Sequence, residues 1–163
     1  MPIDLYRIDD RLIHGQVIVG WGQPMDLGFV VLVDDEVADS EWERELYRMG
    51  VPPEVGLYFA SVDDAVAHLE EWRADARHGI LVTGDVDTMR RLTERAPAIR
   101  EVNVGGIHYR TGRTERLRYL FLSADEEQAL RAMEARGVAI IVRDVPSARP
   151  LKLGDLSGAA KTA

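Results

Sequence analysis

The chain of 163 residues contains no cysteine. It therefore has no disulfide, no thiolate zinc site and no thiol nucleophile. Lysine is almost absent, because only Lys152 and Lys161 occur, both within the last twelve residues, beside eighteen arginines. The body of the chain thus has no lysine for a Walker-type phosphate loop, a Schiff base or a receiver-type phosphorylation site. A phosphate bound here must be held by arginine, backbone amides or hydroxyl groups.

Long apolar runs are also missing. No stretch approaches the roughly 20 residues that a membrane-spanning helix requires, and no apolar signal segment precedes the first expected strand. We therefore expect a soluble, cytoplasmic protein. The net charge of −8 argues against a general nucleic-acid binder, because nucleic-acid phosphates are bound by basic surfaces.

Strand-like and helix-like stretches alternate along the sequence. Apolar runs predict strands at 3–8, 29–33, 55–60, 80–83, 101–104, 117–122 and 138–142. Capping residues and helical apolar spacing predict helices at 15–23, 40–50, 62–74, 87–95 and 123–137. This alternation is typical of repeated βαβ units. We predict an α/β fold with an open, doubly wound, mostly parallel seven-stranded sheet and helices on both faces.

The predicted organisation is a single domain over residues 1–153, followed by a flexible C-terminal tail over 154–163. The glycine-containing segment 105–116 shows no helical period. The strand that follows it could therefore run antiparallel, or reach the sheet by an irregular crossover.

Polar residues follow several of the predicted strands. Ligands of doubly wound sheets bind outside the carboxyl ends of the strands, so these residues are expected to gather at one edge. They are Asp9, Asp10, Arg11 and His14 after the first strand, Asp34 and Asp35 after the second, Thr83 and Gly84 after the fourth, and Asn103, Gly105 and Gly106 at the end of the fifth.

The loop within residues 7–16 combines one histidine, two arginines and two carboxylates. A neutral imidazole can accept a phosphoryl group, and His14 is the expected nucleophile. Arg11 lies three residues earlier, where its guanidinium could fork onto the same group. Asp10 or Asp34 could accept the other imidazole N–H and fix the tautomer.

Four further residues are candidates for holding the phosphoryl group. Gly15 and Gln16 open the next predicted helix, so their backbone N–H groups could bind an anion. Thr83 and Gly105 stand at strand ends that should face the same edge. Plainer roles stay open for several of these residues, since aspartates at such positions also cap helices and paired glycines also make turns.

The loop motif resembles the N-terminal signature of a known family, the IIB component of the mannose/fructose/sorbose-type phosphoenolpyruvate-dependent sugar phosphotransferase system. The similarity covers nearly the whole chain. The segments that carry it are Arg7-Ile-Asp-Asp-Arg-Leu-Ile-His-Gly-Gln-Val17, Val33-Asp-Asp-Glu-Val-Ala38, Pro52, Asn103-Val-Gly-Gly106 and Val145-Pro146.

The resemblance implies a phosphotransferase without a cofactor or a metal. It implies that His14 takes a phosphoryl group from a phosphohistidine of the IIA component, assisted by Arg11. The group then passes to a sugar translocated by the membrane components IIC and IID. Of the two imidazole nitrogens we expect Nδ1 to carry it. The sugar itself and the oligomeric state are not encoded in any recognisable motif.

Two other functions fit the same residues. The chain could be a regulatory phosphorelay module whose phosphorylation state is sensed by another protein, without sugar transport. It could also be a metal-dependent hydrolase with His14, Asp10, Asp34 and Asp35 as ligands, although no helical ligand-pair motif supports this.

Overall fold

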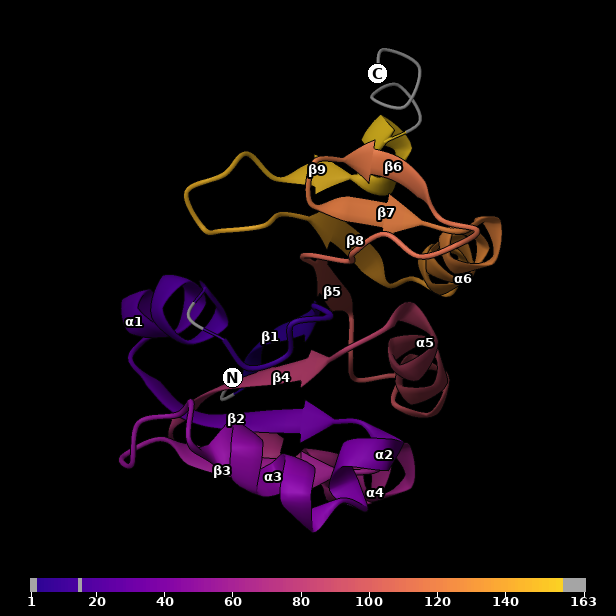
Figure 1. The fold of residues 1–163 in the computed structure, drawn as a ribbon. Coiled ribbons are helices and arrows are strands. Elements are labelled where there is room, and N and C mark those ends of the chain that lie inside the picture. The colour runs from indigo at the N-terminus through magenta and orange to yellow at the C-terminus, as the bar shows by residue number, and fades with distance from the viewer. Residues whose placement is uncertain (1–2, 15, 157–163) are drawn as a thin grey trace.

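The computed structural model describes residues 3–14 and 16–156. Within them, seven strands form one sheet in the order β3-β2-β4-β1-β5-β8-β9 (Figure 1). All neighbours run parallel except β8 and β9, which are antiparallel. The strands are β1 (Ile3–Ile8), β2 (Leu27–Val33), β3 (Gly56–Ala60), β4 (His78–Thr83), β5 (Glu101–Val104), β8 (Ala139–Val142) and β9 (Leu151–Lys152). The predicted mostly parallel seven-stranded α/β sheet is confirmed.

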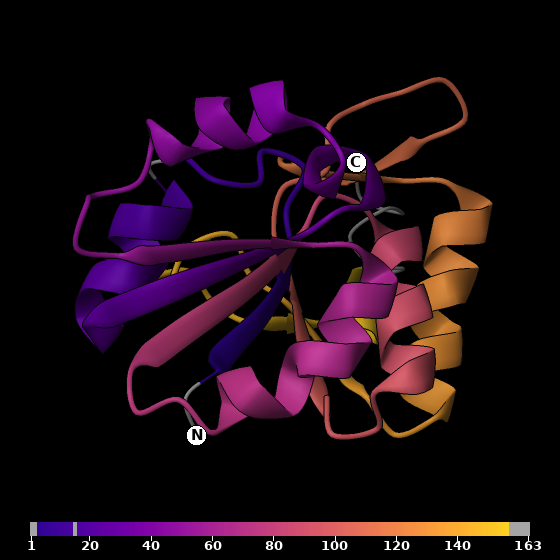
Figure 2. The ribbon, with the colours of Figure 1, turned by 90° about the horizontal axis from the view of Figure 1, so that it is seen from below.

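Helices cover both faces of the sheet (Figure 2). One face carries α4 (Val62–Arg73), α5 (Val86–Arg95) and α6 (Ala124–Ala135). The other carries η1 (Gln16–Trp21), α1 (Gly22–Met25) and α3 (Glu41–Arg48), while the single turn α2 (Asp35–Ala38) follows the end of β2. No helix in the described residues is long and apolar enough to span a bilayer.

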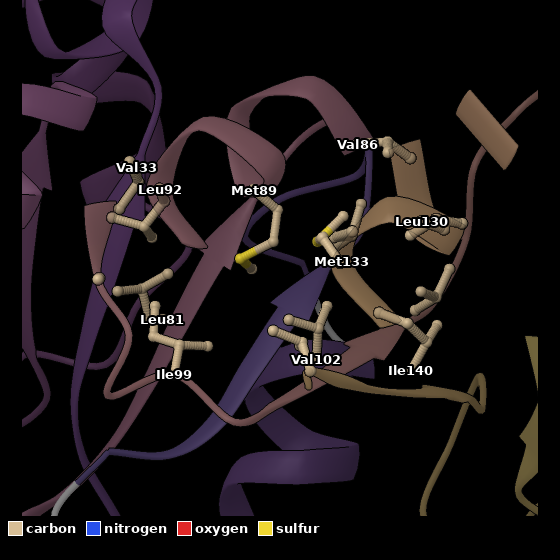
Figure 3. Close-up of a cluster of buried hydrophobic side chains, with 14 of the residues drawn as sticks. Val33, Leu81, Val86, Met89, Leu92, Ile99, Val102, Leu130, Met133 and Ile140 are labelled. Carbon is tan, nitrogen blue, oxygen red and sulfur yellow. The ribbon is translucent and has the colours of Figure 1, made fainter. Parts of the chain in front are cut away.

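The inner strand β2 has a continuously apolar sequence because both of its faces are covered. Its residues alternate between two cores: Phe29, Val31 and Val33 pack with the residues of α4, α5 and α6, whereas Val30 and Leu32 pack on the opposite face. A strand covered on both sides needs apolar residues at every position. Figure 3 shows part of the first core, where Met89 and Met133 from two helices lie over the strands.

The predicted strand 117–122 is wrong in its assignment. This segment belongs to a separate hairpin of β6 (Thr114–Leu117) and β7 (Leu120–Leu122). The apolar pattern was a valid strand signal, since Leu120 and Leu122 are buried. The seventh strand of the main sheet is instead β9, two residues long and too short to give a sequence signal.

Four of the predicted helices begin at side-chain caps, among them α5, where Asp85 accepts from the backbone N–H of Thr88 at 2.7 Å. The hydroxyl of Ser61 accepts from the backbone N–H of Asp64 at 3.1 Å, and Ser40 caps α3 in the same way. Ser123 forms a complete capping box with Glu126. The predicted helix 15–23 is instead a π-helical turn, η1, followed by one α-helical turn.

The domain extends beyond the predicted boundary at residue 153. Residues 153–156 form a helical turn, and both Leu153 and Leu156 are buried in the main core. The expected tail therefore starts too early at Gly154. The rest of that expectation, residues 157–163, lies outside the described residues.

Candidate functional site

The loop that follows β1 is fixed between the carboxyl ends of β4 and β5. The backbone N–H of Asp9 donates to the carbonyl of Thr83 at 2.9 Å, and that of Asp10 donates to Gly106 at 2.9 Å. At the next turn, Leu12 donates back to the carbonyl of Asp9 and adopts a left-handed backbone with φ 55°. The loop is thus anchored on both sides before it reaches His14.

Arg7 is fully buried at the end of β1 and supports the loop from below. Its guanidinium donates to the carboxylate of Asp9 at 3.0 Å and to the backbone carbonyls of Arg143 and Asp144 at 2.9 and 2.8 Å. It also donates to the side-chain oxygen of Asn103 and lies over the ring of Trp21, 5.1 Å from its centroid. These contacts hold the buried positive charge of Arg7 beside the carboxylate of Asp9.

Asp9 connects the buried arginine to a more exposed one. Arg11 donates from Nε to Oδ1 of Asp9 at 2.9 Å and from a terminal nitrogen to Oδ2 at 2.8 Å, a bidentate pair. The same terminal nitrogen reaches Oδ1 of Asp144 at 3.0 Å. The hydrogen bond from Arg11 and the charge of Arg7 outweigh burial and hold the pKa of the Asp9 carboxyl below its ordinary value.

His14 lies against this cluster with its side chain 23% exposed. Its Nε2 is 3.8 Å from Oδ2 of Asp9, the oxygen that also accepts from Arg7 and Arg11. Burial and the charge of Arg11 lower the pKa of the imidazole below its ordinary 6.5, although the Asp9 carboxylate opposes this. The ring is therefore mostly neutral at pH 7, as a nucleophile must be.

The structure places Asp9, rather than the predicted Asp10 or Asp34, beside the imidazole. Asp10 accepts from the backbone N–H of His108 at 2.6 Å and pairs with its Nδ1 at 2.8 Å. Asp34 caps α2 by accepting from the N–H groups of Glu36 and Val37. Both carboxylates thus have other partners, and the expectation that they orient the imidazole is wrong.

The four predicted phosphoryl-holding residues have different outcomes. Thr83 is buried behind the loop, where its hydroxyl donates to the carbonyl of Asp85 at 3.2 Å. The hydroxyl of Thr83 thus already has a hydrogen-bond partner within the protein. Gly15 lies outside the described residues. Gln16 begins η1, but its side chain is not among the parts that the structure describes.

Gly105 provides room for the buried ion pair. A Cβ at this position would lie 2.0 Å from a terminal nitrogen of Arg7 and 2.7 Å from Oδ2 of Asp9. Neither atom can move freely, because both are hydrogen-bonded in a buried site. The absence of a side chain here is thus a requirement of the Arg7–Asp9 pair.

We expect Gly105→Ala to destabilise the protein by about 1–3 kcal/mol, the usual cost of overpacking a dense site. The free energy of unfolding from urea titration measures this. Gly154→Ala is the matched control, because a Cβ there meets nothing within 4 Å. Equal stability of Gly105→Ala and the control would show that Gly105 does not accommodate the ion pair.

Sequence reasoning missed Asp144 and gave Arg7 no separate role. Asp144 follows the strand predicted at 138–142, so the strand-end rule that selected Asp34 would have selected it too. The burial of Arg7 had no such signal, since an arginine within a strand is more often exposed.

The described residues contain no group of three or more histidine, aspartate or glutamate side chains arranged to hold a metal ion. Of the ligands considered for a metal-dependent hydrolase, Asp35 accepts from the backbone N–H of Val62 and from Arg91. The arrangement of the described residues therefore gives that function no support.

The chain is similar to known proteins over nearly its whole length. The family model described as the PTS system sorbose subfamily IIB component matches residues 3–163. The chain is 34% identical over 157 residues to the PTS system mannose-specific EIIAB component of Escherichia coli K12, covering 96% of this chain and 48% of that protein. It thus spans about half the length of these mannose-specific relatives. It is 32% identical over 149 residues to the PTS system sorbose-specific EIIB component of Klebsiella pneumoniae, covering 90% of each.

Solved structures show the same fold. The crystal structure of the IIBSor domain of the sorbose permease from Klebsiella pneumoniae superposes with a TM-score of 0.87 and 28% identity, covering 100% of this chain and 99% of that one. The PTS system N-acetylgalactosamine-specific IIB component 1 from Escherichia coli gives a TM-score of 0.84 and 28% identity, covering 92% of this chain and 98% of that one.

Proposed function

The chain belongs to the sorbose subfamily of phosphotransferase-system IIB components, and on that premise we propose that it is a phosphohistidine carrier in sugar uptake. It accepts a phosphoryl group from the IIA component and passes it to a sugar during translocation by the membrane components IIC and IID. The observation that carries this proposal is the position of the His14 imidazole, 3.8 Å from the Asp9 carboxylate that is paired with Arg11.

The chemistry of acceptance follows from this arrangement. A neutral imidazole nitrogen of His14 attacks the phosphorus of the donor phosphohistidine, so that a new N–P bond forms while the donor N–P bond breaks. The Nε2 atom is buried and faces the Asp9 carboxylate at 3.8 Å, where an incoming phosphoryl group would meet negative charge. We therefore assign the phosphoryl group to Nδ1.

Arg11 supplies the positive charge next to the imidazole. It is held in the bidentate pair with Asp9 and is itself partly exposed. Phosphoryl transfer depends on positioning and charge stabilisation rather than on covalent chemistry by the protein. A guanidinium offers several donors in one plane, which suits the oxygens of a transferring phosphoryl group.

We expect Arg11→Lys to accept the phosphoryl group at least about tenfold more slowly than the wild type, since losing one charge-assisted hydrogen bond costs about 1.5–3 kcal/mol. Rapid-quench measurement of phosphoryl transfer from phosphorylated IIA gives the rate. Arg90→Lys serves as control, because Arg90 is a partly exposed arginine on α5 with two carboxylate partners. Equal rates for Arg11→Lys and wild type would mean that Arg11 does not bind the phosphoryl group.

Membership of the family supports the proposed partners. We propose a phosphorylated IIA component as the donor and a sugar presented by IIC and IID as the acceptor, with the protein acting in the cytoplasm beside the membrane. The alternative, a regulatory phosphorelay module, uses the same site chemistry. Reconstitution with IIC and IID in vesicles separates the two: transfer from phospho-His14 to a sugar supports the carrier, whereas a stable phosphoprotein with no transfer to any tested sugar supports the regulatory module.

A further inference from the structure

Asp144 is the carboxylate in the site for which the proposed chemistry has no role. It follows β8, which is separated from β1 by β5 in the sheet. Its Oδ1 lies 3.0 Å from a terminal nitrogen of Arg11 and 3.8 Å from one of Arg7, and its side chain is 23% exposed. Asp144 therefore shares Arg11 with Asp9.

The backbone of Asp144 is firmly held. Its carbonyl accepts from Arg7 at 2.8 Å and from the indole N–H of Trp21 at 3.0 Å. The neighbouring Arg143 donates to the carbonyls of Pro146 and Ala148 and so fixes the segment that follows. The carboxylate is consequently presented to Arg11 from a rigid support, and its replacement by an amide leaves these backbone bonds in place.

The charges of the cluster balance in the unphosphorylated protein. Arg7 and Arg11 contribute two positive charges, Asp9 and Asp144 contribute two negative ones, and His14 is mostly neutral. A phosphoryl group adds about 1.5–2 negative charges at pH 7. It must then compete with two carboxylates for the same guanidinium groups, of which Arg11 alone is partly exposed.

We propose that Asp144 is a positioning residue that acts through Arg11. It holds Arg11 on Asp9 while His14 is unphosphorylated. Once the N–P bond to His14 has formed, the Asp144 carboxylate competes with the phosphoryl group for Arg11. Asp144 thereby keeps phospho-His14 at high transfer potential, so that the N–P bond breaks readily when an acceptor oxygen bonds to phosphorus and releases its proton to water. This inference rests on the proposed function and adds a residue to it.

The test is the equilibrium constant for transfer from phosphorylated IIA to the protein. In Asp144→Asn the competing charge is gone, so we expect the equilibrium to shift about tenfold toward phospho-His14, which corresponds to about 1.4 kcal/mol. Asp144→Glu should return most of the way to wild type. An equilibrium constant that is unchanged or lower in Asp144→Asn would overturn the proposal, because a merely structural role predicts no gain.

Asp75→Asn is a closely matched control. Asp75 also pairs with an arginine, Arg77, at 2.7 Å and is also 23% exposed, but it precedes the amino end of β4 at the opposite edge of the sheet. The substitution changes net charge equally, and we expect it to leave the equilibrium at the wild-type value. A similar shift in Asp75→Asn would mean that net charge alone causes the effect.

A second readout needs no phosphoryl transfer. In unphosphorylated Asp144→Asn, the pKa of His14 measured by NMR titration should fall below that of the wild type, because a carboxylate has left the cluster. An unchanged His14 pKa would show that Asp144 does not act on the site. If wild type itself is never phosphorylated by charged IIA, the proposed function fails; if wild type is phosphorylated and only the shift in Asp144→Asn is missing, the role of Asp144 alone fails.

Discussion

We expect the replacement of His14 with glutamine to abolish phosphorylation and to leave the fold unchanged. Glutamine keeps a polar side chain of similar reach but has no nitrogen lone pair that can form an N–P bond. The loop does not depend on His14 for its position, because Leu12 and Ile13 are buried in the core beneath it. Intact-mass analysis after incubation with phosphorylated IIA measures the loss, and circular dichroism measures the fold.

His78→Gln is the control for this substitution. His78 begins β4 at the opposite edge of the sheet and pairs with Asp4 at 2.7 Å. This variant should be phosphorylated as fully as the wild type. Phosphorylation of His14→Gln at the wild-type level would remove His14 from the mechanism, and a grossly altered circular dichroism spectrum would assign it a structural role.

The second large effect is expected for Arg7→Met. Removing one partner of a buried ion pair leaves the other charge uncompensated, which typically costs about 3–5 kcal/mol. Arg7 and Asp9 are both fully buried. Methionine cannot donate a hydrogen bond to any of the four groups that accept from the Arg7 guanidinium. Arg11 alone then faces Asp9. We expect a loss of about 3–5 kcal/mol in the free energy of unfolding at pH 7.

The pH dependence of this loss has a defined sign. The pKa of Asp9 is depressed in the folded protein, so its stabilising contribution is present above the unfolded value of 3.8 and is lost as the pH falls through the folded value. The difference between wild type and Arg7→Met should therefore shrink on acidification, since Asp9 in the variant protonates more easily.

Urea denaturation at pH 7 and at a pH below 3.8 measures both effects. Arg90→Met, which removes a partly exposed ion-paired arginine, should change stability by no more than about 0.5 kcal/mol. A loss below about 1 kcal/mol in Arg7→Met, or a difference that grows on acidification, would contradict the assigned role of the Arg7–Asp9 pair.

Much of the fold could be predicted because local sequence and tertiary structure agree. The apolar run that forms β2 indicates a strand buried on both faces, and Ser61 and Ser123 mark the starts of α4 and α6. A very short segment contains too few residues to show a periodic sequence pattern. The two residues of β9 form a strand only because β8 offers an unpaired edge beside them.

The choice of carboxylate in the site could not be predicted in the same way. Asp9 and Asp10 are adjacent and chemically identical, and the sequence offers no ground for preferring one. Their difference comes from tertiary contacts. Asp9 pairs with the buried Arg7 in the space that Gly105 leaves, whereas Asp10 is hydrogen-bonded to His108. The sequence thus identifies the loop and its histidine, and the tertiary contacts assign the partners.

The most direct test of the account is phosphosite analysis of the wild-type protein after incubation with phosphoenolpyruvate, Enzyme I, HPr and the cognate IIA component. The account predicts one acid-labile phosphoryl group, located on His14 by peptide fragmentation under neutral conditions. An unmodified protein in the presence of IIA shown to be phosphorylated, or a phosphoryl group on any other residue, would contradict it.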